Sequence, residues 1–156
     1  MDSQELVRNQ LIELLAGGNA HQPFDQIVAD FPLEQINKQP PGLDYTPWRL
    51  LEHIRIAQVD ILDFIRDPDY ESPEWPAGYW PAPGAKGNLS QWDATVSAIK
   101  ADRQALLEIL RDPETDLFAP LPHAPDYTNL REILVVADHN AYHLGEFGLL
   151  RSILQG

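Results

Sequence analysis

Apolar residues recur at intervals of three or four positions along four long segments of this chain, a spacing that lines one face of an α-helix. The segments cover residues 3–16, 47–66, 90–112 and 128–154. Their ends are well marked. Gly17 and Gly18 end the first, because glycine tolerates the left-handed backbone common after a helix. Thr46 is a good N-cap for the second, and Pro47 suits its first position, where an N–H would have been unpaired.

Proline-rich segments separate these predicted helices. A shorter helix is expected over residues 23–30, a connector over 33–44 and a loop over 113–127. Between residues 68 and 83 five prolines alternate with Trp75, Tyr79 and Trp80. This composition excludes a regular helix and predicts an ordered loop packed over one end of the helices.

No segment alternates between apolar and polar residues with period two, so no sheet is expected. The predicted fold class is therefore all-α. We expect an antiparallel four-helix bundle with an extra short helix and a Pro-rich loop, forming a single domain over residues 1–156.

Composition and charge exclude several function classes. The chain has 156 residues, 44% of them apolar, which is enough for a substantial core. It has no cysteine, which excludes thiolate metal sites and cysteine nucleophiles. With 11 basic and 24 acidic residues its net charge is −13, which disfavours contact with nucleic-acid phosphates. No apolar run approaches the roughly 20 residues of a membrane span, and the N-terminus lacks signal-peptide features. We expect a cytoplasmic protein with no nucleic-acid and no membrane partner.

The densest chemical signal lies in the middle of the last predicted helix, in the sequence DHNAYHLGE at residues 138–146. At about 100° per residue, His139, His143 and Glu146 fall on one narrow face. Two imidazoles one turn apart can hold a metal such as Zn²⁺, which bonds imidazole nitrogen at ~2.0–2.1 Å. The alternative interpretation is two hydrogen-bonded core histidines without a metal.

His53 lies beside the apolar stripe of the second long helix, near the helix start. A single histidine there is usually a core or capping residue. Together with His139 and His143 it would complete a three-ligand site on two helices, which leaves one metal position open for water or substrate. A cation would also compensate the cost of burying three imidazoles together.

These residues resemble the DinB superfamily, which is related to the YfiT-type metal-dependent hydrolases. The resemblance rests on the sequence LEHIRIAQ at residues 51–58 and on the DHxxYHxG element at 138–145, and it covers nearly the whole chain. It implies a homodimeric four-helix bundle with a divalent metal ion, zinc or nickel, on His53, His139 and His143. DinB-like relatives include thiol-dependent transferases and isomerases, which implies a small-molecule substrate or a thiol cofactor as partner.

Glu146 departs from this resemblance, since DinB-like relatives commonly have glutamine at this position. Its carboxylate could be a fourth ligand, an acceptor for a histidine N–H, or a catalytic general base, and a surface acid is the alternative. Asp138 lies about 100° from the face that carries the two histidines. It is expected to face solvent or to contact a metal ligand without binding the metal itself. Asp60, two turns after His53, is expected to be a structural or pocket-lining acid.

The other histidines are expected to be loop residues, with His21 better placed than His123 to line the pocket. The aromatic residues Trp75, Tyr79 and Trp80 either form a wall over the metal or, as we expect, seal the end of the bundle.

Two functions remain open. The first is a metal-dependent enzyme, a hydrolase or thiol-dependent transferase, that activates water or a thiol at the three-histidine site. The second is a non-catalytic metal- or ligand-binding helical bundle with a structural metal. A structural zinc site is normally closed by four protein ligands and a catalytic one is open, so Glu146 discriminates between them.

Overall fold

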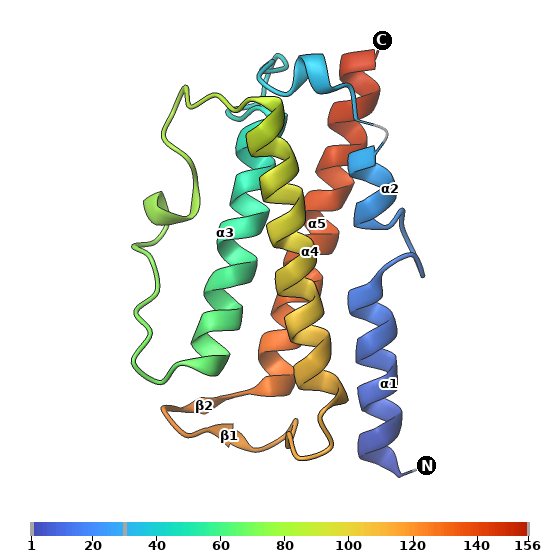
Figure 1. Cartoon of the computed structure of the whole chain (residues 1–156), viewed down its shortest axis with the longest axis vertical. Helices are drawn as coiled ribbons and strands as arrows, with labels where there is room; N and C mark the ends of the chain where they lie inside the picture. Colours follow the sequence, from blue (N-terminus) through green and yellow to red (C-terminus); the bar gives the residue numbers. More distant parts are fainter. Residues whose placement is uncertain (1, 30, 156) are drawn as a thin grey trace.

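The computed structural model describes residues 2–29 and 31–155, which form a mostly helical protein (Figure 1). The α-helices of this described part are α1 (Ser3–Ala16), α2 (Phe24–Ala29), α3 (Pro47–Arg66), α4 (Leu89–Arg111) and α5 (Asn129–Gln155). Two short 3-10 helices, Leu33–Gln35 and Ala77–Tyr79, lie in the connections. All four long predicted helices are present. The predicted short helix occupies residues 24–29, and its expected last residue, 30, lies outside the described residues.

Local capping chemistry sets the helix starts. The Thr46 hydroxyl accepts a hydrogen bond from the backbone N–H of Arg49 at 3.2 Å, and Pro47 is the first residue of α3, as predicted. At α4 the side chain of Asn88 accepts from the backbone N–H of Gln91, while the Gln91 side chain accepts from the backbone N–H of Asn88. This reciprocal capping box starts α4 just before the predicted position.

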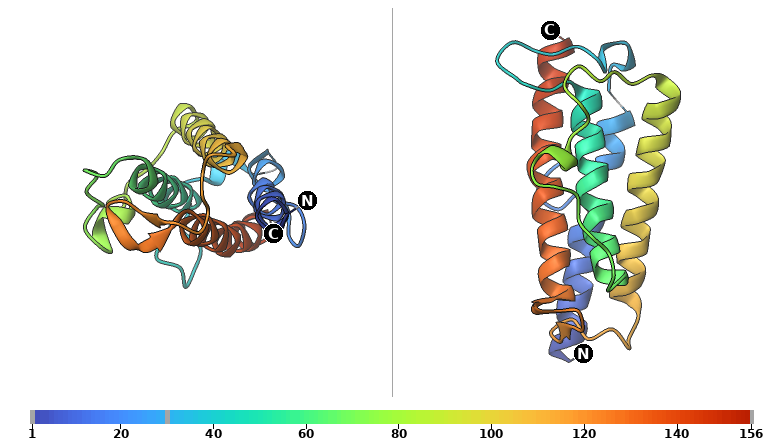
Figure 2. Two further views of the ribbon diagram at one scale, coloured as in Figure 1. Left: turned by 90° about the horizontal axis from the view of Figure 1, so that it is seen from below. Right: turned by 90° about the vertical axis from the view of Figure 1, so that its left-hand side faces the viewer.

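The long helices lie side by side, with α3 packed against both α4 and α5, and α1 packed against α4 and α5. Figure 1 and Figure 2 show α3 and α4 running in the same direction, whereas α5 runs opposite to both. The expectation of an antiparallel relation throughout therefore does not hold for α3 and α4. The 22-residue connection between them, residues 67–88, lies along α3 and returns the chain to the end where α3 began.

The position of this connection corrects a second expectation. Instead of covering one end of the helices, the aromatic segment runs beside α3 (Figure 2) and contacts the middle of that helix. The physical reason is the parallel pairing of α3 and α4. A 20-residue helix is about 30 Å long, so the chain must travel that distance before α4 can start.

The expectation of no sheet was wrong in one place. Two short strands, β1 (Pro120–Leu121) and β2 (Ala124–Thr128), form an antiparallel hairpin just before α5. Strands of two and five residues are too short for a period-two signal, and β2 is exposed or half-buried along its length, without alternation.

The core places α3 opposite α5. Leu50, Leu51 and Ile54 of α3 are fully buried and belong to one apolar cluster with Phe147 and Leu150 of α5. Because α3 and α5 are neighbours with opposite directions, the first half of α3 faces the middle of α5. Among the described helices, none has the length and apolar character needed to cross a membrane.

Candidate metal centre

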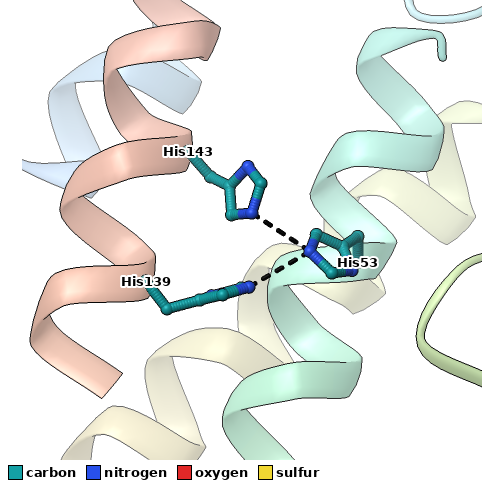
Figure 3. Close-up of side chains that lie close together, drawn as sticks. All are labelled: His53, His139 and His143. Atoms are coloured by element: carbon teal, nitrogen blue, oxygen red, sulfur yellow. Dashed lines mark hydrogen bonds between the residues drawn. The ribbon is translucent and has the colours of Figure 1, made fainter. Parts of the chain in front are cut away.

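Three histidine side chains converge between α3 and α5 (Figure 3). The Nε2 atom of His53 lies 3.0 Å from Nε2 of His143 and 3.1 Å from Nε2 of His139. Each ring offers one nitrogen, and these atoms all lie within 4.8 Å of one another. The side chains of His53 and His143 are buried, with 4% and 8% of their surface exposed, and His139 is half-buried. The structure thus brings together the three histidines that the sequence singled out.

Hydrogen bonds on the far side of two rings fix which nitrogen carries the proton. Nδ1 of His53 lies 2.7 Å from the backbone oxygen of Tyr79, which can only accept a hydrogen bond. Nδ1 of His143 lies 2.5 Å from Oε2 of Glu146, also an acceptor. Both rings therefore donate from Nδ1, and their Nε2 atoms present lone pairs to the centre.

This arrangement fits a cation. When His139 donates its Nε2 proton to His53, the lone pairs of His53 and His143 still face each other at 3.0 Å, which is unfavourable without a positive charge between them. A tetrahedral metal at ~2.0–2.1 Å from each ligand separates imidazole nitrogens by about 3.3 Å, close to the separations observed. A ligand histidine that donates its other N–H to a carboxylate or carbonyl is the usual pattern at metal sites.

The protonation states also suit a metal. Burial lowers the pKa of His139 to about 4, with smaller contributions from His143 and His53 in the same direction. Burial likewise lowers the pKa of His53, although its hydrogen bond to the Tyr79 carbonyl acts in the opposite sense. These two imidazoles are therefore neutral near pH 7, which is the form that binds metal ions.

Glu146 stands behind His143 and not beside the converging nitrogens. Its Oε2 atom accepts from His143 Nδ1, and its Oε1 atom accepts from the hydroxyl of Tyr45 at 2.9 Å. Among the described residues, the group able to hold one ion consists of the three histidines without Glu146. Burial and the Glu146 carboxylate raise the pKa of the Tyr45 phenol, which keeps it protonated as a donor.

The aromatic segment supplies contacts that sequence reasoning did not assign. The Trp80 ring stacks on His53 with centroids 3.9 Å apart and an interplanar angle of 4°. The Tyr79 hydroxyl donates to Oδ2 of Asp60 at 2.8 Å, while its backbone carbonyl holds His53. The alternative in which these aromatics form a wall over the histidines is therefore the one observed. Tyr79 and Trp80 follow His53 by 26 and 27 residues, and this spacing alone does not indicate a contact. The contact arises because the connection between the parallel helices α3 and α4 runs back along α3.

A cleft of about 420 Å³ opens beside the histidines. It lies between α3, the first half of α5, the aromatic segment and strand β2. Asp60 lines it, as expected for a pocket-lining acid. Its lining residues are His53, Ala57, Asp60, Ile61, Phe64, Ser72, Trp75, Tyr79, Tyr127, Arg131, Glu132, Val135 and His139.

The remaining candidates lie elsewhere. His21 is exposed, with Nδ1 2.9 Å from the backbone oxygen of Gln22, and it lines a separate small cavity of about 50 Å³. His123 lies 2.8 Å from the backbone oxygen of Phe64. Asp138 is exposed, as the helical projection predicted. Neither loop histidine belongs to the group of described side chains that could hold a metal.

One comparison with known proteins identifies the family of the chain. No curated protein and no solved structure gives a significant match to the chain. The family model of the DinB superfamily matches residues 7–147, a span that contains all three converging histidines, the whole of α3 and α5 up to Phe147. The chain therefore belongs to the DinB superfamily.

Proposed function

We propose that this protein is a metal-dependent enzyme of the DinB type, built on a four-helix bundle, in which His53, His139 and His143 hold a divalent metal ion, zinc or nickel. The proposed reaction is attack by an activated water or thiol on a small electrophilic substrate, as in a hydrolase or a thiol-dependent transferase. The observation that carries the proposal is the convergence of three Nε2 atoms, two of them on rings whose Nδ1 protons are already engaged.

The open character of the site favours an enzyme over a structural metal. Three protein ligands leave at least one coordination position, whereas structural zinc sites normally have four. Both oxygens of Glu146 are occupied by hydrogen bonds on the far side of His143, so this residue is better placed to orient the ring than to close the site. His53 and His139 line the cleft, which gives a substrate access to that position.

A bound divalent ion would supply Lewis-acid chemistry there, polarising a substrate carbonyl or lowering the pKa of a water or thiol. The protein's own residues do the positioning. Tyr79 and Glu146 hold the two rings in the tautomer that offers Nε2, and Tyr45 holds Glu146. Trp80 covers one face of His53 and shields it from solvent.

A non-catalytic role for the metal is the competing function. The three histidines connect α3 to α5, and the Tyr79 contact adds the aromatic segment, so a metal would also brace these elements. The two functions differ in what metal removal does. A purely structural metal would change the unfolding temperature without supporting turnover of any substrate.

Metal analysis of purified protein tests the site. We expect about one divalent ion per chain, as in three-histidine sites generally. The double variant His139→Ala/His143→Ala should lose it, and the matched variant His21→Ala, at an exposed histidine outside the cluster, should retain it. Metal retained at full stoichiometry in the double variant contradicts the assignment.

A screen of simple esters and amides, with and without thiol cofactors, then tests the enzyme. Turnover by the metal-loaded protein, lost on chelation and restored by added metal, supports an enzyme. Stoichiometric metal that raises the unfolding temperature without turnover of any compound supports the structural role.

A further inference from the structure

The cleft beside the histidines has an apolar, aromatic wall. Phe64 and Tyr127 pack edge to face with centroids 5.7 Å apart, and Trp75 packs against Tyr79 at 5.3 Å. The Trp75 side chain is 75% exposed, an unusual amount for so large an apolar residue. Together with Ile61 of α3, these side chains suit a flat or apolar ligand body.

One acid on the α3 side of this cleft lacks a positive partner. Asp60 is 7% exposed, and its Oδ2 atom accepts a hydrogen bond from Tyr79. The Tyr70 phenol also interacts with this carboxylate, but Oδ1 is buried and accepts no direct hydrogen bond from a described residue. No described lysine or arginine forms an ion pair with it. Burial and the nearby Asp60 carboxylate raise the pKa of both Tyr70 and Tyr79 to about 12. Both phenols are therefore uncharged near pH 7, and neither adds a second negative charge beside Asp60.

The other charged lining residues neutralise each other. Glu132 of α5 is buried and pairs with Arg131 at 2.7 Å. The Arg131 guanidinium also lies over the Tyr127 ring, 4.5 Å from its centroid. The cleft therefore contains one carboxylate, Asp60, whose negative charge nothing in the wall balances. A buried carboxylate in such surroundings is stabilised by a cation that donates hydrogen bonds.

From this combination we infer that the cleft binds a small amine, with an aromatic or apolar body against Trp75 and Phe64 and a protonated nitrogen at Asp60. Asp60 follows His53 by seven residues, or about 10 Å along α3, and Phe64 lies one turn further in the same direction. The amine nitrogen is thus placed between the histidines and the Phe64 side of the cleft. The preference for an amine does not rest on the proposed metal function.

Three probes of one shape test the inference: phenethylamine, 2-phenylethanol and phenylacetate, which are cationic, neutral and anionic near pH 7. Titrations followed by calorimetry and by the indole N–H signals in NMR spectra would be run on metal-loaded and on chelated protein. We expect phenethylamine to bind at least about tenfold more tightly than 2-phenylethanol in both forms, with phenylacetate weakest in the chelated protein. The Trp75 signal should shift, while that of Trp92, buried in the core, should not.

A pair of variants locates the preference. Asp60→Asn keeps an oxygen for the Tyr79 hydroxyl and should lower phenethylamine affinity about tenfold while leaving 2-phenylethanol unchanged. Asp63→Asn removes the same charge from α3 at a position that does not line the cleft and should preserve the ranking. Should Asp60→Asn fail to fold, the ranking of the three probes on the wild-type protein still decides.

The outcomes separate this inference from the proposed function. Equal binding of the amine and the alcohol, or shifts confined to signals outside the cleft, overturn the inference even when the protein binds metal. Persistence of the amine preference in protein that binds no metal leaves the inference standing and removes the metal function.

Discussion

The hydrogen bond between His143 and Glu146 gives a quantitative prediction. Glu146→Gln replaces a charge-assisted bond from Nδ1, 2.5 Å long, with a neutral one. Bonds to charged groups contribute about 1.5–3 kcal/mol and neutral ones about 1 kcal/mol, so the loss is about 0.5–2 kcal/mol, or roughly 2–30-fold in metal affinity. The glutamine side chain has one oxygen where Glu146 has two, so its NH₂ group must face either His143 or the Tyr45 hydroxyl. We therefore expect the loss of metal affinity to lie in the upper half of this range.

Competitive titration against a chelator of known affinity measures the effect. The metal stoichiometry should stay unchanged, because Glu146 is outside the group of converging ligand atoms. Asp138→Asn is the matched control: it removes an exposed acid next to His139 and should change the affinity less than twofold, since surface charges contribute little. Tyr45→Phe, which frees one Glu146 oxygen, should lie between these two variants.

Two results would refute this reasoning. Wild-type affinity in Glu146→Gln would mean that the carboxylate does not orient His143. Complete loss of metal, with correct folding by circular dichroism, would mean that Glu146 is itself a ligand and that the site is closed.

Two further predictions concern the histidine cluster, and a third concerns the packing around two glycines. The pKa of His139 is depressed to about 4 in the folded state, so the metal-free protein should have its full stability above pH 6.5 and lose part of it as the pH falls towards 4. The loss in the free energy of unfolding should be on the order of 2 kcal/mol after allowance for partial exposure. Denaturant titrations at several pH values should show a flatter dependence of stability on pH in His139→Ala. Trp80 stacks on a cluster histidine, so Ni²⁺ should quench tryptophan fluorescence, and Trp80→Phe should remove most of the quenching; quenching of equal size in the variant contradicts the stacking. Gly87→Ala would place a Cβ 2.2 Å from the Trp48 ring and should lower the free energy of unfolding by about 1–3 kcal/mol, whereas Gly148→Ala, with open space around its Cβ in α5, should raise it by up to about 1 kcal/mol.

Local signals along the chain predicted the helices well. Thr46 and Pro47 define the start of α3 through chemistry confined to one turn, and the structure has it there. The facing of His139 and His143 likewise follows from helical rotation alone. These features were predictable because each depends on residues within a few positions of one another.

Features that depend on chain direction were not predictable in the same way. The contact between the Tyr79 carbonyl and His53 requires α3 and α4 to be parallel, and no local pattern encodes that relation. The Tyr45 hydroxyl meets Glu146 across 101 residues of sequence. The role of Glu146 therefore stayed open among four alternatives until the positions of its neighbours were known.

Tyr79 contacts two lining residues of the cleft at once, with its carbonyl on His53 and its hydroxyl on Asp60. A ligand that draws Asp60 away from this hydroxyl, or shifts the Tyr79 ring, would change the support of His53, a proposed metal ligand. Thermodynamic linkage makes such an effect reciprocal: whatever factor the cleft ligand applies to metal affinity, the metal applies to the affinity of the ligand. With the proposed metal and amine both bound, a single loop residue would couple the occupancy of the two sites.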